Sequence, residues 1–298
     1  MRVLISGASG MIGKAVSALL DGRHEVHALV RDAARARPGD LLWQPASALD
    51  AAQIAGFDVI VHLAGRPVAT LWTERAKAEI RNSRIEGTAN LAQAAAQAFL
   101  ANGRPRALIC SSASGYYGSR GDEELVEESE AGLGFLAEVC REWESAAHPA
   151  AMAGVRVAHM RTSLVLDAEG GALAKMLPAF HMGIAGKLGS GHQWWSWVSL
   201  KDAARAYAFA VENERVHGAL NLAAPNAVTN AEFTRTLGRV LHRPTLLAVP
   251  ALLLRAVAGE MAVEMLLASQ RVIPKRLLEA GFNFEDPALE PALRRLLA

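Results

Sequence analysis

The glycine-rich stretch from Gly7 to Gly13 constrains the fold of this chain more than any other segment. An apolar run that starts at the second residue ends at Gly7, and a helical pattern begins after Gly13. In such a strand–turn–helix unit, the glycines reverse the chain, admit a pyrophosphate to the backbone, and let the helix pack closely on the strand. The positive N-terminal end of the helix then faces the phosphates. An ordinary glycine-rich turn is the alternative. The expected dinucleotide contacts are Gly7, Ser9, Gly10, Met11, Ile12 and Gly13.

The end of the second expected strand bears on which dinucleotide binds. Residues 24–30 form a second strand-like run that ends at Arg31, and Arg35 and Arg37 follow closely. An acid at this position usually holds the two ribose hydroxyls of NAD, whereas an arginine suits the 2′-phosphate of NADP. A guanidinium can grip phosphate through two parallel hydrogen bonds. The sequence therefore favours NADP(H), with a solvated surface arginine as the alternative.

Composition excludes several other classes of protein. Of the 298 residues, 51% are apolar, and 31 basic residues balance 30 acidic ones. This is typical of a globular protein with a large core, and it gives no sign of nucleic-acid or membrane binding. The two cysteines, Cys110 and Cys140, are too few for a disulfide framework and lack metal-ligand spacing. Because the first strand begins at once, we expect no signal peptide and a cytoplasmic protein.

Further apolar runs are expected to extend the same sheet. Residues 58–65 form a buried strand that runs into a turn of small residues. We expect Leu63, Ala64 and Gly65 at its end to line the cofactor near its adenosine and pyrophosphate. Residues 106–110 lead into a hydroxyl-rich segment, 111–118, at the edge where ligands collect. Strands separated by helices predict a parallel sheet with right-handed crossovers.

The expected domain organisation has two parts. Residues 1–166 form the dinucleotide-binding domain, and residues 198–224 return to its sheet. Residues 167–197 and 225–298 form a smaller, mostly helical lobe for a substrate. Three tryptophans cluster in a glycine-rich loop of this lobe, which is a poor place to bury them all. We therefore expect a partly open pocket wall there, with burial in the core as the alternative.

The chain resembles the extended, epimerase-like branch of the short-chain dehydrogenase/reductases, and within it an atypical group called epimerase family proteins. The resemblance implies a doubly wound Rossmann domain, a smaller C-terminal lobe and bound NADP(H), but it brings no known substrate. The segments that carry it are Gly7–Gly13, Trp72–Thr73 with Asn82–Ser83–Arg84, Ser111–Gly118, Gly170–Gly171, Gly186–Trp197, Asn221–Phe233 and Pro274–Phe282. The last two segments belong to a C-terminal extension typical of that group.

The catalytic residues implied by the resemblance are missing. Working members of the superfamily use a serine and a Tyr-x-x-x-Lys pair, whose helical spacing places the ammonium beneath the phenol. None of the three tyrosines, Tyr116, Tyr117 and Tyr207, has a lysine four residues later. Ala113 stands where the usual serine would fall, and Arg84 stands where epimerases commonly keep an asparagine.

Two functions stay open. In the first, the protein is an NADP(H)-dependent oxidoreductase or epimerase-like enzyme that acts on a small substrate such as a sugar nucleotide or another anion. In the second, it binds NADP(H) without turnover, as a redox-linked sensor or interaction protein. The oligomeric state is open between a monomer and a homodimer.

The first function assigns roles to particular residues. A hydroxyl at the end of the fourth strand would hydrogen-bond a substrate oxygen, and a charged residue of the following helix would replace the lost proton relay. Arg84 would bind the cofactor or hold an anionic substrate. The hydroxyl candidates are Ser112, Ser114, Tyr116 and Tyr117, the relay candidates are Glu138 and Arg141, and the pocket candidates are Trp72, Gln193, Trp194 and Trp197.

Overall fold

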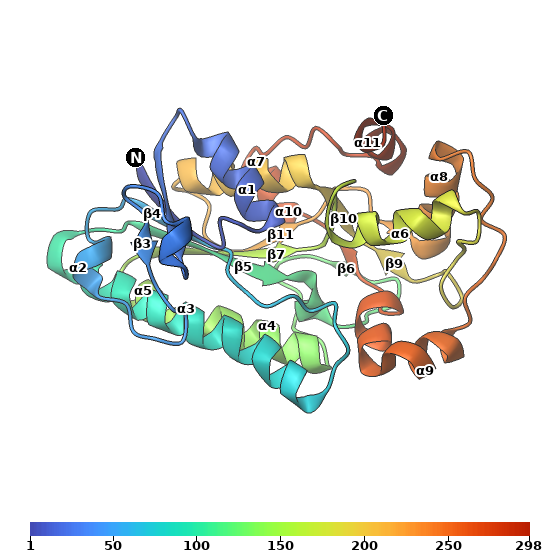
Figure 1. Cartoon of the computed structure of the whole chain (residues 1–298), viewed down its shortest axis with the longest axis horizontal. Coiled ribbons are helices and arrows are strands. Elements are labelled where there is room, and N and C mark those ends of the chain that lie inside the picture. The colour runs from blue at the N-terminus through green and yellow to red at the C-terminus, as the bar shows by residue number, and fades with distance from the viewer.

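The computed structural model describes all residues, 1–298, and is built around a seven-stranded parallel sheet (Figure 1). The strand order is β11-β7-β5-β4-β1-β2-β3, which runs outward from β1 in both directions. This is the doubly wound Rossmann arrangement, so the expected fold class is confirmed. The strands are β1 (Arg2–Ser6), β2 (Glu25–Val30), β3 (Leu41–Leu42), β4 (Val59–His62), β5 (Ala107–Ala113), β7 (Arg156–Thr162) and β11 (Gly218–Leu222).

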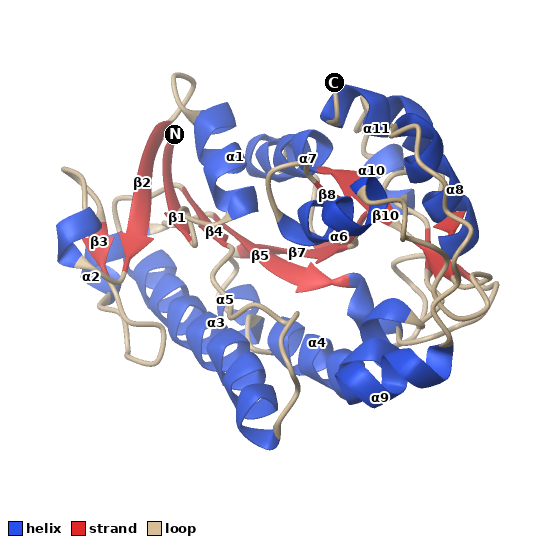
Figure 2. Ribbon diagram, turned by 45° about the vertical axis from the view of Figure 1, so that its right-hand side comes forward, coloured by secondary structure: helices blue, strands red, loops and turns tan.

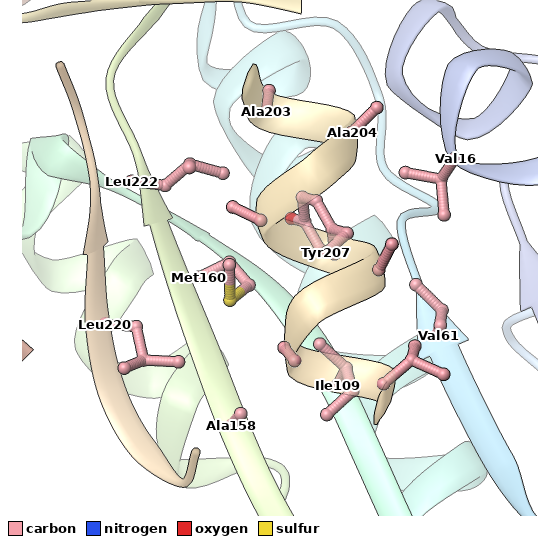
Figure 3. Close-up of a cluster of buried hydrophobic side chains, with 14 of the residues drawn as sticks. Val16, Val61, Ile109, Ala158, Met160, Ala203, Ala204, Tyr207, Leu220 and Leu222 are labelled. Atoms are coloured by element: carbon pink, nitrogen blue, oxygen red, sulfur yellow. The ribbon is translucent and has the colours of Figure 1, made fainter. Parts of the chain in front are cut away.

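Helices cover both faces of the sheet (Figure 2). Helices α1 (Met11–Leu20) and α7 (Leu200–Glu212) pack together on one face. In the core between them and the sheet, the buried Tyr207 of α7 lies beside Met160 (Figure 3). The opposite face is covered by α2 (Ala51–Ile54), α3 (Glu74–Asn102), α4 (Phe135–Ser145) and α5 (His148–Met152).

The long helix α3 has clear start and stop signals. Thr73 caps its beginning, because the Ala76 amide donates to the Thr73 side-chain oxygen at 3.1 Å. Gly103 ends it in the left-handed conformation, with φ of +74°. Its buried residues are mostly alanines, and they pack against the sheet and α5.

A second core lies to the side of the sheet. It unites buried side chains of α6 (Gly171–His181), α8 (Asn230–Val240) and α11 (Leu289–Leu296) with Trp195 and Trp197. Two short strand pairs hold this part together: β8 (Leu164–Leu166) with β10 (Trp197–Ser199), and β9 (Trp194–Trp195) with β12 (Val228–Thr229). A third pair, β6 (Glu124–Leu125) with β13 (Arg271–Val272), packs around Tyr117 instead.

The C-terminal part of the chain contacts the rest of the molecule at two places. Leu277 of α10 (Lys275–Glu279), Phe282 and Phe284 belong to the same core as α1, α7 and the sheet. Before them, α9 (Ala251–Met261) buries none of its side chains. With the short π-helix η3 (Ala262–Leu266) that follows, it lies beside the start of α4 (Figures 1 and 2). The remaining short turns are η1 (Ala33–Arg35) and η2 (Ser114–Tyr117). None of the helices combines the length and the apolar character that crossing a membrane requires.

Candidate functional site

The glycine turn between β1 and α1 leaves no room for side chains. Gly7 has φ of +73°, and a Cβ there would lie 2.8 Å from the backbone of Leu63 and Ala64. A Cβ on Gly13 would lie 2.2 Å from the Gly7 carbonyl oxygen. Both positions therefore require glycine. The turn, the end of β4 and the start of α1 form one backbone-lined cradle at the carboxyl edge of the sheet.

The N-terminus of α1 is bare. Gly10 caps the helix without a side-chain hydrogen bond, and no acidic residue lies in the first turn. The first N–H groups of a helix have no partner within the helix, and they carry the positive end of its dipole. This end of α1, at Met11 and Ile12, is therefore suited to a phosphate group.

Arg31 follows β2 directly, beside this cradle in the strand order. Its side chain is exposed and has no carboxylate partner, whereas Arg35 pairs with Asp32 at 3.7 Å and Arg37 with Asp40 at 3.5 Å. Of the three arginines, Arg31 alone has no carboxylate partner to compete with an external anion.

His62, at the end of β4, is a buried structural residue. Its Nδ1 lies 2.6 Å from the Ser6 hydroxyl, and its Nε2 has no hydrogen-bond partner. Burial lowers the pKa of His62 to about 4, because the charged imidazolium would lose its hydration. The ring is therefore neutral at physiological pH.

Ser112 belongs to a buried polar network rather than to an open site. Its hydroxyl donates to Glu144 Oε1 at 2.7 Å. Arg161 Nε and Nη2 donate to the two oxygens of the same carboxylate, each at 2.9 Å. Burial acts to lower the pKa of Arg161, but the hydrogen bonds and charge of Glu144 outweigh it and raise the pKa overall. This fork of two hydrogen bonds between Glu144 and Arg161 joins α4 to β7, and the Ser112 hydroxyl is already bonded to the same carboxylate.

Tyr117 is part of the same network. It is fully buried, and its hydroxyl donates to Asn221 Oδ1 at 2.7 Å while accepting from Arg161 Nη1 at 2.9 Å. Burial raises the pKa of Tyr117 to about 12. The assignment of Ser112 and Tyr117 to substrate binding is therefore corrected, because both hydroxyls are buried and satisfied by the protein.

The other two hydroxyl candidates stay nearer to solvent. Ser114 is half-buried and donates to Gln270 Oε1 at 2.8 Å. Tyr116 is also half-buried, and the Arg161 guanidinium lies 3.4 Å from the centre of its ring. The Tyr116 hydroxyl has no hydrogen-bond partner in the protein. Tyr116 is thus the candidate whose polar group remains available.

Helix α4 does not direct Glu138 and Arg141 toward these hydroxyls. Both lie on its exposed face. The inner face instead carries Leu136 and Cys140, four residues apart, and these two side chains pack against Gly115 of η2. A Cβ on Gly115 would lie 3.1 Å from Leu136 and 3.9 Å from the Cys140 sulfur. The expected proton relay through Glu138 or Arg141 is therefore corrected. The charged side chain that α4 does direct inward, Glu144, is already bonded to Ser112 and Arg161.

Arg84 reaches the end of β4 from helix α3. Its Nη1 donates to the Ile80 carbonyl at 3.0 Å and its Nη2 to the Arg66 carbonyl at 2.9 Å. The guanidinium carbon of Arg84, Cζ, lies 5.0 Å from the centre of the Trp143 ring. A Cβ on Gly65 would lie 3.4 Å from the same Cζ atom. Burial lowers the pKa of Arg84. The guanidinium has no carboxylate partner.

The expected aromatic pocket wall is largely core. Trp197 is fully buried and donates to the Asn226 carbonyl at 3.1 Å. Gln193 is buried too, with its amide donating to the carbonyls of Leu188 and Leu266 at 3.0 and 3.1 Å. These two pocket assignments are corrected, because both side chains hold loops together.

Trp194 and Trp72 remain partly accessible. Trp194 donates to Asp122 at 2.8 Å, and the guanidinium of Arg271 covers its ring at 4.6 Å. Trp72 packs edge-on against Phe135, at the start of α4, with ring centres 5.0 Å apart. The structure therefore brings Trp72 to the N-terminal end of α4 and leaves Trp194 elsewhere, next to β12.

Sequence reasoning missed Glu264 of the C-terminal extension. Its two carboxylate oxygens accept hydrogen bonds from the Phe135 and Leu136 amides, each at 2.8 Å. It thereby caps α4, whose own N-cap residue, Gly134, has no side chain. The missing local cap is a signal in the sequence, but nothing local says which distant carboxylate supplies it.

Two family models match the chain. Residues 3–223 match the NAD dependent epimerase/dehydratase family, and residues 249–296 match a domain of unknown function, DUF1731. The first match covers the whole sheet and the cradle. The second covers α9, η3 and the segments that follow them.

Relatives match over nearly the full length. The human epimerase family protein SDR39U1 is 36% identical over 303 residues, covering 100% of both chains. An epimerase family protein of Mycobacterium bovis is 42% identical, covering 98% of this chain and 96% of its own.

Solved structures agree in fold. The crystal structure of human SDR39U1 (isoform 2) with NADPH has a TM-score of 0.88 at 34% identity, covering 99% of both chains. At 17% identity, UDP-glucose 4-epimerase from Thermus thermophilus, in complex with NAD, shares the fold with a TM-score of 0.76, covering 99% of this chain and 97% of its own. With its sheet, its glycine cradle and more than two thirds of its length accounted for, the chain belongs to the NAD dependent epimerase/dehydratase family.

Proposed function

We propose that this protein is an NADP(H)-dependent oxidoreductase or epimerase-like enzyme that acts on a small anionic substrate. The observation that carries the proposal is the bare N-terminus of α1 behind the Gly7 turn, with the unpaired Arg31 at the end of the neighbouring strand. The crystal structure of the human relative with NADPH supports the same cofactor.

The residues of the cradle fit this cofactor. A Cβ at Gly7 or Gly13 would collide with backbone atoms, so the turn keeps its backbone open to a close-lying pyrophosphate. The α1 N–H groups would hold the pyrophosphate, and Arg31 would hold the 2′-phosphate. Leu63, Ala64 and Gly65 would line the cofactor along the edge of the sheet. When bound, NADPH supplies a hydride.

The protein groups beside this edge can orient a substrate. The Tyr116 hydroxyl, which has no protein partner, would hydrogen-bond a substrate oxygen and exchange a proton with it. Ser114 lies two residues before it and would help to position the same oxygen. Glu144 holds the Arg161 guanidinium in place, and this guanidinium packs against the Tyr116 ring.

One group of observations favours the alternative, a cofactor-dependent sensor or interaction protein. Where α4 packs against the end of β5 and η2, the side chains are those of Ala113, Leu136 and Cys140. None of these three is a carboxylate or an amine. In that case NADP(H) would bind without turnover, and its redox state would alter a conformation or a partner contact.

Replacing Arg31 by alanine is expected to weaken NADPH binding at least about tenfold, because a charge-assisted hydrogen-bond pair to phosphate is lost. NADH binding is expected to stay unchanged. Fluorescence titration of both cofactors measures the two affinities. Arg35→Ala is the matched control, since Arg35 already pairs with Asp32. An equal loss for NADPH and NADH would contradict the assignment of Arg31 to the 2′-phosphate.

Hydride transfer is tested with NADPH deuterated at the transferable position. The protein is incubated with the labelled cofactor and a metabolite extract, and mass spectrometry screens the products for a gain of deuterium. A labelled product, lost in Tyr116→Phe while NADPH affinity stays the same, supports a reductase that uses Tyr116. Absence of label despite NADPH binding argues for the sensor or for an epimerase that returns its hydride to the same molecule. Trapped cofactor with candidate sugar nucleotides separates those two.

A further inference from the structure

One side chain of the C-terminal extension, Gln270, holds both ends of the short turn that carries Tyr116. The Ser114 hydroxyl donates to Gln270 Oε1 at 2.8 Å, and Gln270 Nε2 donates to the Gly118 carbonyl at 3.0 Å. Ser114 begins η2, and Gly118 follows its last residue. We call these two hydrogen bonds the Gln270 clamp. Tyr116 lies midway between the two residues that the clamp joins.

The backbone of Gln270 is itself fixed from both sides. Its N–H donates to the Trp194 carbonyl at 3.0 Å, and its carbonyl accepts from the Ser196 hydroxyl at 2.8 Å. The next residue, Arg271, begins β13, which pairs with β6. The half-buried Gln270 side chain therefore extends from an ordered segment, which makes it suited to holding a neighbouring turn in place.

The clamp also decides which hydroxyl of the turn has a proton to give. A backbone carbonyl only accepts hydrogen bonds, so the Nε2 side of the Gln270 amide faces Gly118 and the Oε1 side faces Ser114. The single hydroxyl proton of Ser114 is thus directed to Gln270. Tyr117 donates its proton to Asn221. Tyr116 is left as the hydroxyl of this turn that can donate to a ligand.

Other contacts hold the backbone and the ring of Tyr116 but not its hydroxyl. Inside the turn, the Gly118 amide donates to the Gly115 carbonyl at 3.0 Å. The Gly132 amide donates to the Tyr116 carbonyl at 2.9 Å. The Arg161 guanidinium lies against the ring. These two amides therefore report on whether the turn around Tyr116 is closed.

We propose that Gln270 is a positioning residue, which holds the turn 114–118 so that the Tyr116 hydroxyl stays in place for proton exchange with a substrate. The inference rests on the proposed function, because that function gives Tyr116 its role. It also gives a role to the C-terminal extension, the segment matched by the domain of unknown function. The extension would complete the site by fixing a turn that the sheet delivers.

The first test measures the turn itself. Gln270→Met keeps an unbranched side chain and removes both hydrogen bonds of the clamp. Hydrogen exchange of the Gly118 and Gly132 amides, followed by NMR, should become at least about tenfold faster, because two hydrogen bonds that oppose local opening are lost. Gln193→Met is the matched control, since the Gln193 amide also bonds two carbonyls but does not touch the turn.

A milder variant covers the case in which Gln270→Met does not fold. Ser114→Ala removes one hydrogen bond of the clamp and leaves the bond from Gln270 to Gly118. It should speed exchange at Gly118 by about threefold or more. Exchange rates within about twofold of the wild-type values in both variants, or an equal increase in Gln193→Met, would show that the clamp does not hold the turn and would overturn the proposal.

The second test measures hydride transfer from deuterated NADPH into the metabolite extract. Gln270→Met should slow the transfer at least about tenfold while NADPH affinity stays within about twofold, because the cofactor cradle is untouched. If Gln270 acts through Tyr116, adding Gln270→Met to Tyr116→Phe should cause no further loss. Unchanged transfer in Gln270→Met, or a full additional loss in the double variant, would contradict the positioning role.

A spectroscopic measurement separates this inference from the proposed function. If the wild-type protein transfers no label, that result counts against the proposed hydride transfer alone. NMR of protein labelled with 13C-tyrosine then decides the inference, because the chain has 3 tyrosines and Tyr116→Phe identifies the signal of Tyr116. A Tyr116 signal that shifts or broadens in Gln270→Met but not in Gln193→Met supports the positioning role. An unchanged signal overturns it.

Discussion

Glu144→Leu is expected to lower the free energy of unfolding by about 3–5 kcal/mol, because it leaves the buried Arg161 without its counter-ion. The fork of two 2.9 Å hydrogen bonds between these side chains is lost, and the Ser112 hydroxyl loses its acceptor as well. Chemical denaturation at neutral pH, with the slope on denaturant checked for constancy, measures the change.

Glu142→Leu is the matched control on the same helix. Glu142 pairs with Arg81 at the surface, where such pairs contribute about 0–1 kcal/mol. The double variant Glu144→Leu with Arg161→Met should recover part of the loss, since it removes the unpaired charge. Equal effects of Glu144→Leu and Glu142→Leu would show that the buried fork contributes no more than a surface pair.

Acidification from pH 6.5 to pH 4 is expected to cost the folded state about 3 kcal/mol through His62 alone. Burial holds the pKa of His62 at about 4 in the folded protein, against 6.5 when exposed. Below pH 6.5, His62 binds a proton in the unfolded chain but stays neutral in the folded state. The contribution of His62 to the free energy of unfolding is therefore largest above pH 6.5 and decreases as the pH falls toward 4. Burial also lowers the pKa of His159, which acts in the same direction.

The contribution of His62 is measured as a difference between proteins. In His62→Asn, the unfolding free energy should depend less steeply on pH between 4 and 6.5, whereas His181→Gln, a change at an exposed position on α6, should keep the wild-type slope. NMR of the histidine rings in the folded wild-type protein is an independent measurement. A His62 titration midpoint near 6.5 would contradict the expected effect.

Local sequence signals predicted the sheet and the glycine turn between β1 and α1 well. Gly7, Gly10 and Gly13 act within a few residues of one another, so their spacing alone specifies a strand, a turn and a helix. The apolar runs around them alternate with helices, which is enough to predict a parallel sheet. No knowledge of distant contacts was needed for these features.

The candidate catalytic residues depended on distant contacts and were predicted less well. Tyr116 and Tyr117 are adjacent in the sequence, but the second is buried because Arg161 and Asn221, far along the chain, hydrogen-bond its hydroxyl. Trp197 follows a glycine-rich stretch of sequence, yet it lies in β10 and shares a buried core with side chains of α8 and α11. Local patterns carry no information about such partners.

The placement of Leu277, Phe282 and Phe284 in the main core has a consequence for synthesis on the ribosome. The sheet receives its last strand at residues 218–222, and the apolar surface beside α7 is covered only by residues 277–284. A nascent chain that has already built α7 and the whole sheet up to β11 therefore still exposes that surface. Chaperone binding to the growing chain should persist until nearly all of it has emerged.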